Sequence, residues 1–110
     1  MATIIPFDDL RYSPTARLFQ GGEHGVPASV FITTYERGQG PQLHWHPYPE
    51  VFVVLTGTAS FTVGDEQLTV EEGHIVIGPA ETPHSFKCAG DDTLRMVSVH
   101  PSPTVQQTDL

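Results

Sequence analysis

The chain has 110 residues, a formal net charge of -8 at pH 7 and a single cysteine, and these values exclude several classes of protein. A chain of this length buries one hydrophobic core, so we expect a single domain over residues 1–110. The acidic surplus argues against nucleic acid as a partner, and no segment approaches the roughly 20 apolar residues that span a bilayer. One cysteine allows no disulfide within the chain. Because the first nine residues also lack the features of a signal peptide, we expect a cytoplasmic protein without membrane contact.

Ten glycines and ten prolines favour short strands joined by tight turns. Residues 1–27 should be irregular, with short strands only at Ile4–Ile5 and Leu18–Phe19. From residue 29 onward, β-branched and aromatic runs alternate with turn residues. The predicted strands are 29–35, 43–46, 50–55, 58–63, 67–70, 74–77, 84–88 and 94–100. This regular spacing predicts an all-β sandwich or small barrel, followed by a polar tail, 101–110, that is either partly disordered or packed on a partner subunit.

Three side chains with metal-binding chemistry lie close together in the sequence, at His44, His46 and Glu50. In an extended strand with a period of two, all three point to the same face, and His residues at i and i+2 stand about 7 Å apart at Cα. An exposed polar face is the simplest alternative. The apolar run 51–55 favours a buried strand, in which an unpaired glutamate would be costly. Imidazole and carboxylate together suit a divalent transition metal, so the sequence predicts a metal site.

The stretch from Gly38 to Gly57 resembles the first conserved motif of the cupin superfamily, G-x5-H-x-H-x3-E-x6-G, with every fixed position present. The second cupin motif, G-x5-P-x-G-x2-H-x3-N, matches at Gly73, Pro79 and His84. The resemblance covers residues 38–88. It implies a double-stranded β-helix, or jelly-roll, barrel, and it implies that His84 is the fourth metal ligand beside His44, His46 and Glu50.

The second motif departs from the family pattern at two positions. Glu81 occupies the glycine slot, where a left-handed backbone would cost a glutamate about 1–2 kcal/mol. Cys88 occupies the asparagine slot and is expected to be a small buried hydrophobic residue. The three remaining histidines have no such motif, and we expect surface or core positions without a ligand role for His24, His74 and His100.

Neighbouring residues suggest the surroundings of the site. Phe52 and Phe86 each lie two residues from a predicted ligand, so in a strand they would point to the ligand face and form apolar pocket walls. Arg95 is the only basic residue that could reach a substrate. Trp45 points to the opposite face, as outer packing or as part of an interface. The apolar run 51–55 needs cover on both faces. We therefore expect a homodimer, with Trp45 and residues 1–27 as the natural contacts.

The resemblance implies three His and one Glu around one divalent transition metal (Fe, Mn, Zn, Ni, Co or Cu) with two open positions. The first hypothesis is a metal-dependent enzyme, of the dioxygenase type of oxidoreductase, that acts on a small oxygen-bearing substrate. Glu50, or a hydroxide held by the metal, would be the catalytic base. Cupin cyclases, isomerases and lyases are alternatives within this class. The second hypothesis is a non-catalytic module that binds a small ligand. A storage-type cupin without metal is hard to reconcile with four intact ligands.

Overall fold

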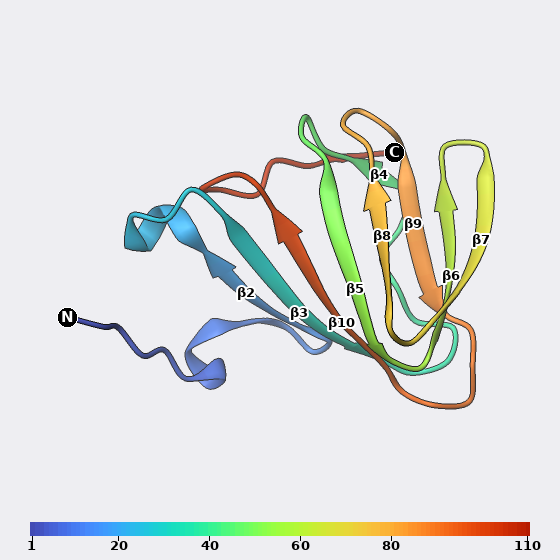
Figure 1. Cartoon of the computed structure of the whole chain (residues 1–110), viewed down its shortest axis with the longest axis horizontal. Helices are drawn as coiled ribbons and strands as arrows, with labels where there is room; N and C mark the ends of the chain where they lie inside the picture. Colours follow the sequence, from blue (N-terminus) through green and yellow to red (C-terminus); the bar gives the residue numbers. More distant parts are fainter.

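The computed structural model describes residues 1–110 and consists of two antiparallel sheets that face each other (Figure 1). The six-stranded sheet contains, in spatial order, β1 (Arg11–Ser13), β2 (Ala16–Gln20), β3 (Ser29–Tyr35), β10 (Leu94–His100), β5 (Glu50–Thr56) and β8 (His74–Gly78). The five-stranded sheet contains β11 (Thr108–Asp109), β4 (His44–Trp45), β9 (His84–Cys88), β6 (Thr58–Val63) and β7 (Glu66–Glu71). Two single-turn 3-10 helices, η1 (Phe7–Leu10) and η2 (Gly21–His24), complete the chain. The predicted all-β jelly-roll architecture is confirmed.

The predicted strands from residue 29 onward all form, and each begins and ends within one residue of its expected position. Leu18–Phe19 lies inside β2, as expected. The prediction of a strand at Ile4–Ile5 is wrong. Residues 1–6 extend away from the body of the molecule (Figure 1), where no neighbouring strand could pair with them, and the Ile4 side chain is fully exposed. No helix in the structure has the length and apolar character that crossing a membrane requires.

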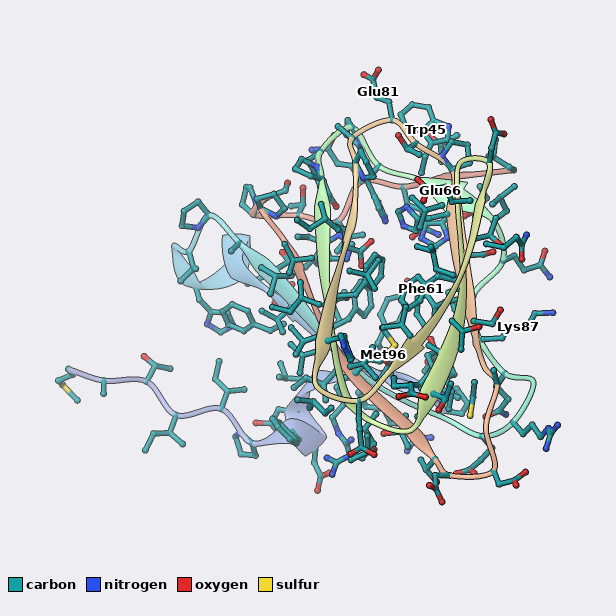
Figure 2. The ribbon with its side chains drawn as sticks, turned by 45° about the vertical axis from the view of Figure 1, so that its right-hand side comes forward. Trp45, Phe61, Glu66, Glu81, Lys87 and Met96 are labelled. Atoms are coloured by element: carbon teal, nitrogen blue, oxygen red, sulfur yellow. The ribbon has the colours of Figure 1, made fainter.

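The core lies between the two sheets, because alternate residues of each central strand point inward. On β10, Leu94 and Met96 are buried, and on β6 the same holds for Ala59 and Phe61. Figure 2 shows Phe61 and Met96 inside the molecule and Lys87 pointing away from it. Cys88 is also part of this core, as the sequence predicts. One end of the space between the sheets is filled in this way, and the polar side chains of the candidate site gather at the other end.

Two turns have unusual backbone conformations, one at the core end of the barrel and one beside the site. Gly57 has a φ of +84°, and a Cβ there would lie 2.7 Å from the carbonyl oxygen of Thr93, so only glycine fits the turn between β5 and β6. Glu81 has a φ of +58° and is the only non-glycine residue with a positive φ. Its N–H donates to the carbonyl oxygen of His46 at 2.7 Å. Glu81, in the glycine slot of the motif, therefore has the left-handed backbone conformation that is strained for a glutamate.

The C-terminal segment, residues 101–110, is a structural part of the barrel. It runs from the end of β10 across the open end between the sheets to β4 (Figure 1). There β11 pairs with β4, with Thr108 opposite Trp45 and Asp109 opposite His44. The Leu110 N–H donates to the carbonyl oxygen of Leu43 at 3.1 Å. The segment thus links the six-stranded sheet to the five-stranded sheet beside the histidines.

Candidate metal centre

The four side chains implied as ligands come together inside the barrel. His44, His46, Glu50 and His84 are all buried, and one ligand atom from each lies within 4.8 Å of the others. His44 on β4 and His84 on β9 face each other as partners in one sheet, and Glu50 begins β5 in the other sheet. His46 follows β4 in the loop between the sheets. The cluster could therefore hold a metal between the two sheets.

Hydrogen bonds orient each of the three imidazoles. The Nδ1 atoms of His44, His46 and His84 lie 2.6, 2.7 and 3.2 Å from the backbone carbonyl oxygens of Gln42, Gln106 and Thr82. Because a carbonyl only accepts, each Nδ1 carries a hydrogen, and in the neutral ring Nε2 then has the lone pair that a metal needs. A hydrogen bond from the distal ring nitrogen to a carbonyl is the usual way in which proteins orient metal-binding histidines.

The charges around Glu50 favour a cation at the centre. Burial works against its ionised form, but the imidazoles of His100, His46 and His84 outweigh burial and hold the pKa of Glu50 well below its usual range. For His46, burial opposes the charged form, while the Glu50 carboxylate and the Gln106 carbonyl raise its pKa. Burial, aided by the neighbouring His84 and His46, lowers the pKa of His44. The Glu50 carboxylate is thus a buried anion, and a cation bound beside it would balance its charge.

The orphaned nitrogen of His46 provides a direct test of whether a metal fits. Its Nε2 lies 3.1 Å from Oε1 of Glu50, yet this buried atom has no aligned hydrogen-bond partner. A buried acceptor without a partner costs about 1–3 kcal/mol. A divalent ion bound by the Nε2 atoms and the carboxylate would satisfy this lone pair and offset the charge of Glu50. The residues present fit a borderline transition metal such as those expected from the sequence.

His100 belongs to this site, although the sequence motifs do not indicate it. It is 1% exposed, and its Nε2 lies 3.0 Å from Oε2 of Glu50, close but not aligned as a hydrogen bond. Its Nδ1 lies 2.7 Å from the hydroxyl of Tyr48. The expectation of a core histidine holds only in part, because the ring contacts the cluster. His24 and His74 are exposed, as expected. Its spacing on β10 could have indicated this position: His100 lies an even number of residues from Leu94 and Met96, so all three side chains point inward.

A cavity of about 170 Å³ lies beside the cluster, bordered by His44, His46, Glu50 and His100. Its other walls are mainly aromatic and hydroxyl-bearing side chains, namely Tyr12, Ser13, Phe31, Thr33, Tyr35, Phe86 and Ser98. No lysine or arginine lines it.

Two expectations about the pocket walls need correction. Phe86 lines the cavity, as predicted, but Phe52 does not; it packs in the core against the ring of His84, with the ring centroids 5.4 Å apart. The prediction that Arg95 could reach a substrate is wrong. Leu94 and Met96 point inward on β10, so Arg95 between them is exposed on the outer face. The cavity therefore has aromatic walls but no basic group.

Comparison with known proteins places this geometry in a family. A family model described as "Cupin domain" matches residues 31–100. No curated protein matches the chain. Among solved structures, the oxalate decarboxylase of Lactobacillus farciminis in complex with formate has a TM-score of 0.81 at 20% identity, over 94% of this chain and 34% of that one.

Two further structures share the fold. A structure of Bacillus subtilis oxalate decarboxylase, concerned with its Mn(II) centres, has a TM-score of 0.79 at 19% identity, over 90% of this chain and 29% of that one. A conserved protein with a double-stranded β-helix domain from Klebsiella pneumoniae has a TM-score of 0.78 at 19% identity, over 98% of this chain and 96% of that one. The chain spans about a third of the length of these oxalate decarboxylases. With a family model that matches most of its length and a double-stranded β-helix fold, the chain belongs to the cupin family.

Proposed function

We propose that this cupin is a metal-dependent enzyme of the dioxygenase type, acting on a small oxygen-bearing organic substrate. One divalent transition metal would be held by His44, His46, Glu50 and His84. The observation that carries this proposal is the orientation of the imidazoles: their Nδ1 atoms all bond to backbone carbonyls, and the Nε2 atoms of His46 and His84 both point at Oε1 of Glu50, 3.1 Å away. When bound, such an ion supplies Lewis acidity and open positions for oxygen atoms.

The side chains around the cavity indicate how a substrate would be held and which group could accept a proton. Glu50 is the candidate base, but its lowered pKa makes it a weak proton acceptor, so we assign its main role to holding the metal. Phe86, Phe31 and Tyr35 would exclude water and contact the apolar part of the substrate. The hydroxyls of Thr33 and Ser98 are the available hydrogen-bonding groups on the wall.

Size and charge restrict the substrate class. The cavity of about 170 Å³ is smaller than the roughly 300–1,000 Å³ of pockets for drug-sized ligands. A divalent ion and the Glu50 carboxylate together carry a charge of +1. A neutral or monoanionic substrate suits this balance. A dianion such as oxalate would leave an uncompensated negative charge in a buried cavity without lysine or arginine, which is costly.

The proposal is tested first by elemental analysis of the purified protein. Oxygen uptake and product formation would then be measured with Mn(II), Fe(II), Co(II) or Ni(II) and a panel of neutral and monoanionic compounds bearing two vicinal oxygen atoms, with oxalate as the dianionic comparison. We expect turnover of a panel member that His46→Ala abolishes. A protein that neither contains nor binds Fe, Mn, Zn, Ni, Co or Cu would refute the metal centre.

A small-ligand-binding protein without catalysis is the second candidate. The observation that favours it is that the carboxylate of Glu50, the candidate base, is already in contact with His46, His84 and His100 at 3.0–3.1 Å. In that case a panel compound would bind to the metal-loaded protein without oxygen uptake or product. Product formation without oxygen uptake would instead indicate a cyclase, isomerase or lyase. These three outcomes are distinguishable in the same experiment.

We also propose that the protein is a cytoplasmic homodimer, joined through the outer face of the six-stranded sheet and not through Trp45, which lies on the five-stranded sheet. Two cross-strand rows of β-branched residues run over β8, β5, β10 and β3, namely Ile77, Val51, Val99 and Val30, and Ile75, Val53, Val97 and Ile32. Ile75 and Ile77 are 64% and 63% exposed. Neither row contains an acidic residue, although the chain has 13. Two chains of charge -8 repel each other, so this neutral apolar face is the surface on which a second copy would pack, sheet against sheet.

A further inference from the structure

We propose that Tyr48, His100 and the peptide group of Gln106 form a positioning network that sets the affinity of the site for its metal. The inference rests on the proposed metal centre and concerns residues beyond the four ligands. Gln106 also lies outside residues 31–100, the part of the chain that the family model matches.

The contacts form a closed ring. The Gln106 carbonyl oxygen lies 2.7 Å from Nδ1 of His46, and the Gln106 N–H donates to the Tyr48 hydroxyl at 3.2 Å. That hydroxyl lies 2.7 Å from Nδ1 of His100, whose Nε2 lies 3.0 Å from Oε2 of Glu50. Oε1 of Glu50 lies 3.1 Å from Nε2 of His46, which closes the ring. Two of the four candidate ligands are therefore connected through one peptide group of the C-terminal segment.

The donors and acceptors of this ring have one consistent direction. The Tyr48 oxygen accepts the Gln106 N–H, and the carboxylate oxygen Oε2 of Glu50 can only accept, so a neutral His100 ring carries its hydrogen on the Nε2 that faces it. Nδ1 of His100 is then an acceptor, and the Tyr48 O–H donates to it. Interaction at Oε2 leaves Oε1 directed toward His46 and His84. The network thus keeps Oε2 of Glu50 in contact with His100 and leaves Oε1 to bind the metal.

Packing holds the network rigid. The Tyr48 ring stacks on the His46 ring, with centroids 5.2 Å apart and planes within 6°. Prolines at 47 and 49 limit the backbone on either side of Tyr48. Gln106 is held by the pairing of β11 with β4 two residues further on. A ring of rigid parts orients His46 and Glu50 before a metal arrives, and such supporting contacts typically account for 10–100-fold in metal affinity.

The test uses the full chain and Co(II) as the probe. Tyr48→Phe removes the hydroxyl but keeps the aromatic ring on His46. We expect its Co(II) affinity, measured by competition with a chelator, to fall at least about 10-fold. Its Co(II) absorption spectrum should also change, because the His100 ring that faces Oε2 of Glu50 loses the hydroxyl that orients it. The melting temperature of the metal-free protein should change little. A merely structural role would lower that temperature and leave the affinity and the spectrum as they were.

Two control variants separate the network from general effects. Gln106→Ala removes an exposed side chain but keeps the peptide group that makes both contacts, so its Co(II) affinity should equal that of the wild type. Tyr12→Phe makes the same chemical change at a tyrosine outside the network, on the wall of the cavity, and should also leave the Co(II) affinity unchanged.

A double-mutant cycle provides the second measurement. His100→Leu should weaken Co(II) binding, and His100→Gln, which keeps an N–H donor, should recover part of the loss. The double variant Tyr48→Phe/His100→Leu should lose less than the two single losses combined, because both changes break the same ring. Wild-type affinity in Tyr48→Phe, or fully additive losses, would overturn the network while leaving the metal centre intact. A wild type that does not bind Co(II) or other transition metals would overturn the proposed function itself.

Discussion

Glu50 and Gly78 face each other across β5 and β8, and the missing side chain of Gly78 makes room for the ring of His84. A Cβ at residue 78 would lie 3.2 Å from Nδ1 of His84, closer than most carbon contacts in proteins. The glycine therefore has a steric role at the site, although its φ is not positive.

From this contact we predict that Gly78→Ala displaces the His84 imidazole and weakens Co(II) or Mn(II) binding by about 10-fold, as expected when a ligand is misplaced. Gly90→Ala is the matched control, because its Cβ would meet only ordinary contacts with Thr58, at 3.4 Å or more. Isothermal titration of the metal into each purified variant measures the difference. Equal affinities for the two variants would contradict the steric role.

The ligand roles predict a graded loss of metal. Glu50→Gln keeps the shape of the side chain but removes the anion, whereas His46→Ala removes a ligand nitrogen and leaves a cavity. We expect metal content to fall in the order wild type, Glu50→Gln, His46→Ala, and the melting temperature of the metal-loaded protein to fall with it, since an ion bound only by the native state stabilises that state. Inductively coupled plasma analysis of the three proteins decides the matter. Full occupancy in both variants would remove these residues from the site.

Glu81 stands in a backbone conformation that favours glycine. Glu81→Gly should relieve about 1–2 kcal/mol of strain and add about 0.5–1 kcal/mol of chain entropy to the unfolded state. The net expectation is a free energy of unfolding raised by about 0.5–1 kcal/mol, or roughly 2–6 °C in melting temperature. Glu72→Gly, the same change at an exposed turn residue without positive φ, should be neutral or destabilising. Calorimetry of both variants in the metal-free state checks this, and a loss of stability in Glu81→Gly would contradict it.

The proposed dimer predicts that a charge on the apolar sheet face separates the subunits. Ile75→Lys should give a monomer in multi-angle light scattering at micromolar concentration, because the buried ammonium groups of a dimer would lack partners. The side chain is 64% exposed in the single chain, so the fold should survive. Leu43→Lys, the same type of change at a 39% exposed residue beside β4 of the other sheet, should leave the mass at that of a dimer. A monomeric wild type would rule the dimer out.

The strands between residues 29 and 100 could be predicted because local chemistry determines them. Alternating apolar residues require one buried face, and glycine or proline ends each run. The family motif predicts the cluster of His44, His46 and Glu50, but the three side chains converge from two facing sheets and the loop between them, and not from one face of a single strand. Leu94 and Met96 are apolar and set the phase of β10, so the sequence itself indicates that Arg95 between them points outward.

Other features depend on contacts between distant parts of the chain. His100 reaches Glu50 only because β10 pairs with β5, with Val99 opposite Val51. β11 has just two residues and no apolar alternation, and it forms because the C-terminal segment meets the edge of β4. Ile4–Ile5 has a sequence suited to a strand but no neighbouring strand with which to pair. In each case tertiary placement decides the outcome, and local propensity carries no information about it.

The position of the candidate site between the sheets has a mechanical consequence. His44 and His84 belong to the five-stranded sheet, whereas Glu50 belongs to the six-stranded one. An ion shared by them would act as a cross-link between two layers in a chain whose single cysteine cannot form one. Under pulling force or partial unfolding, the open end of the barrel would then separate last when metal is bound and first after chelation.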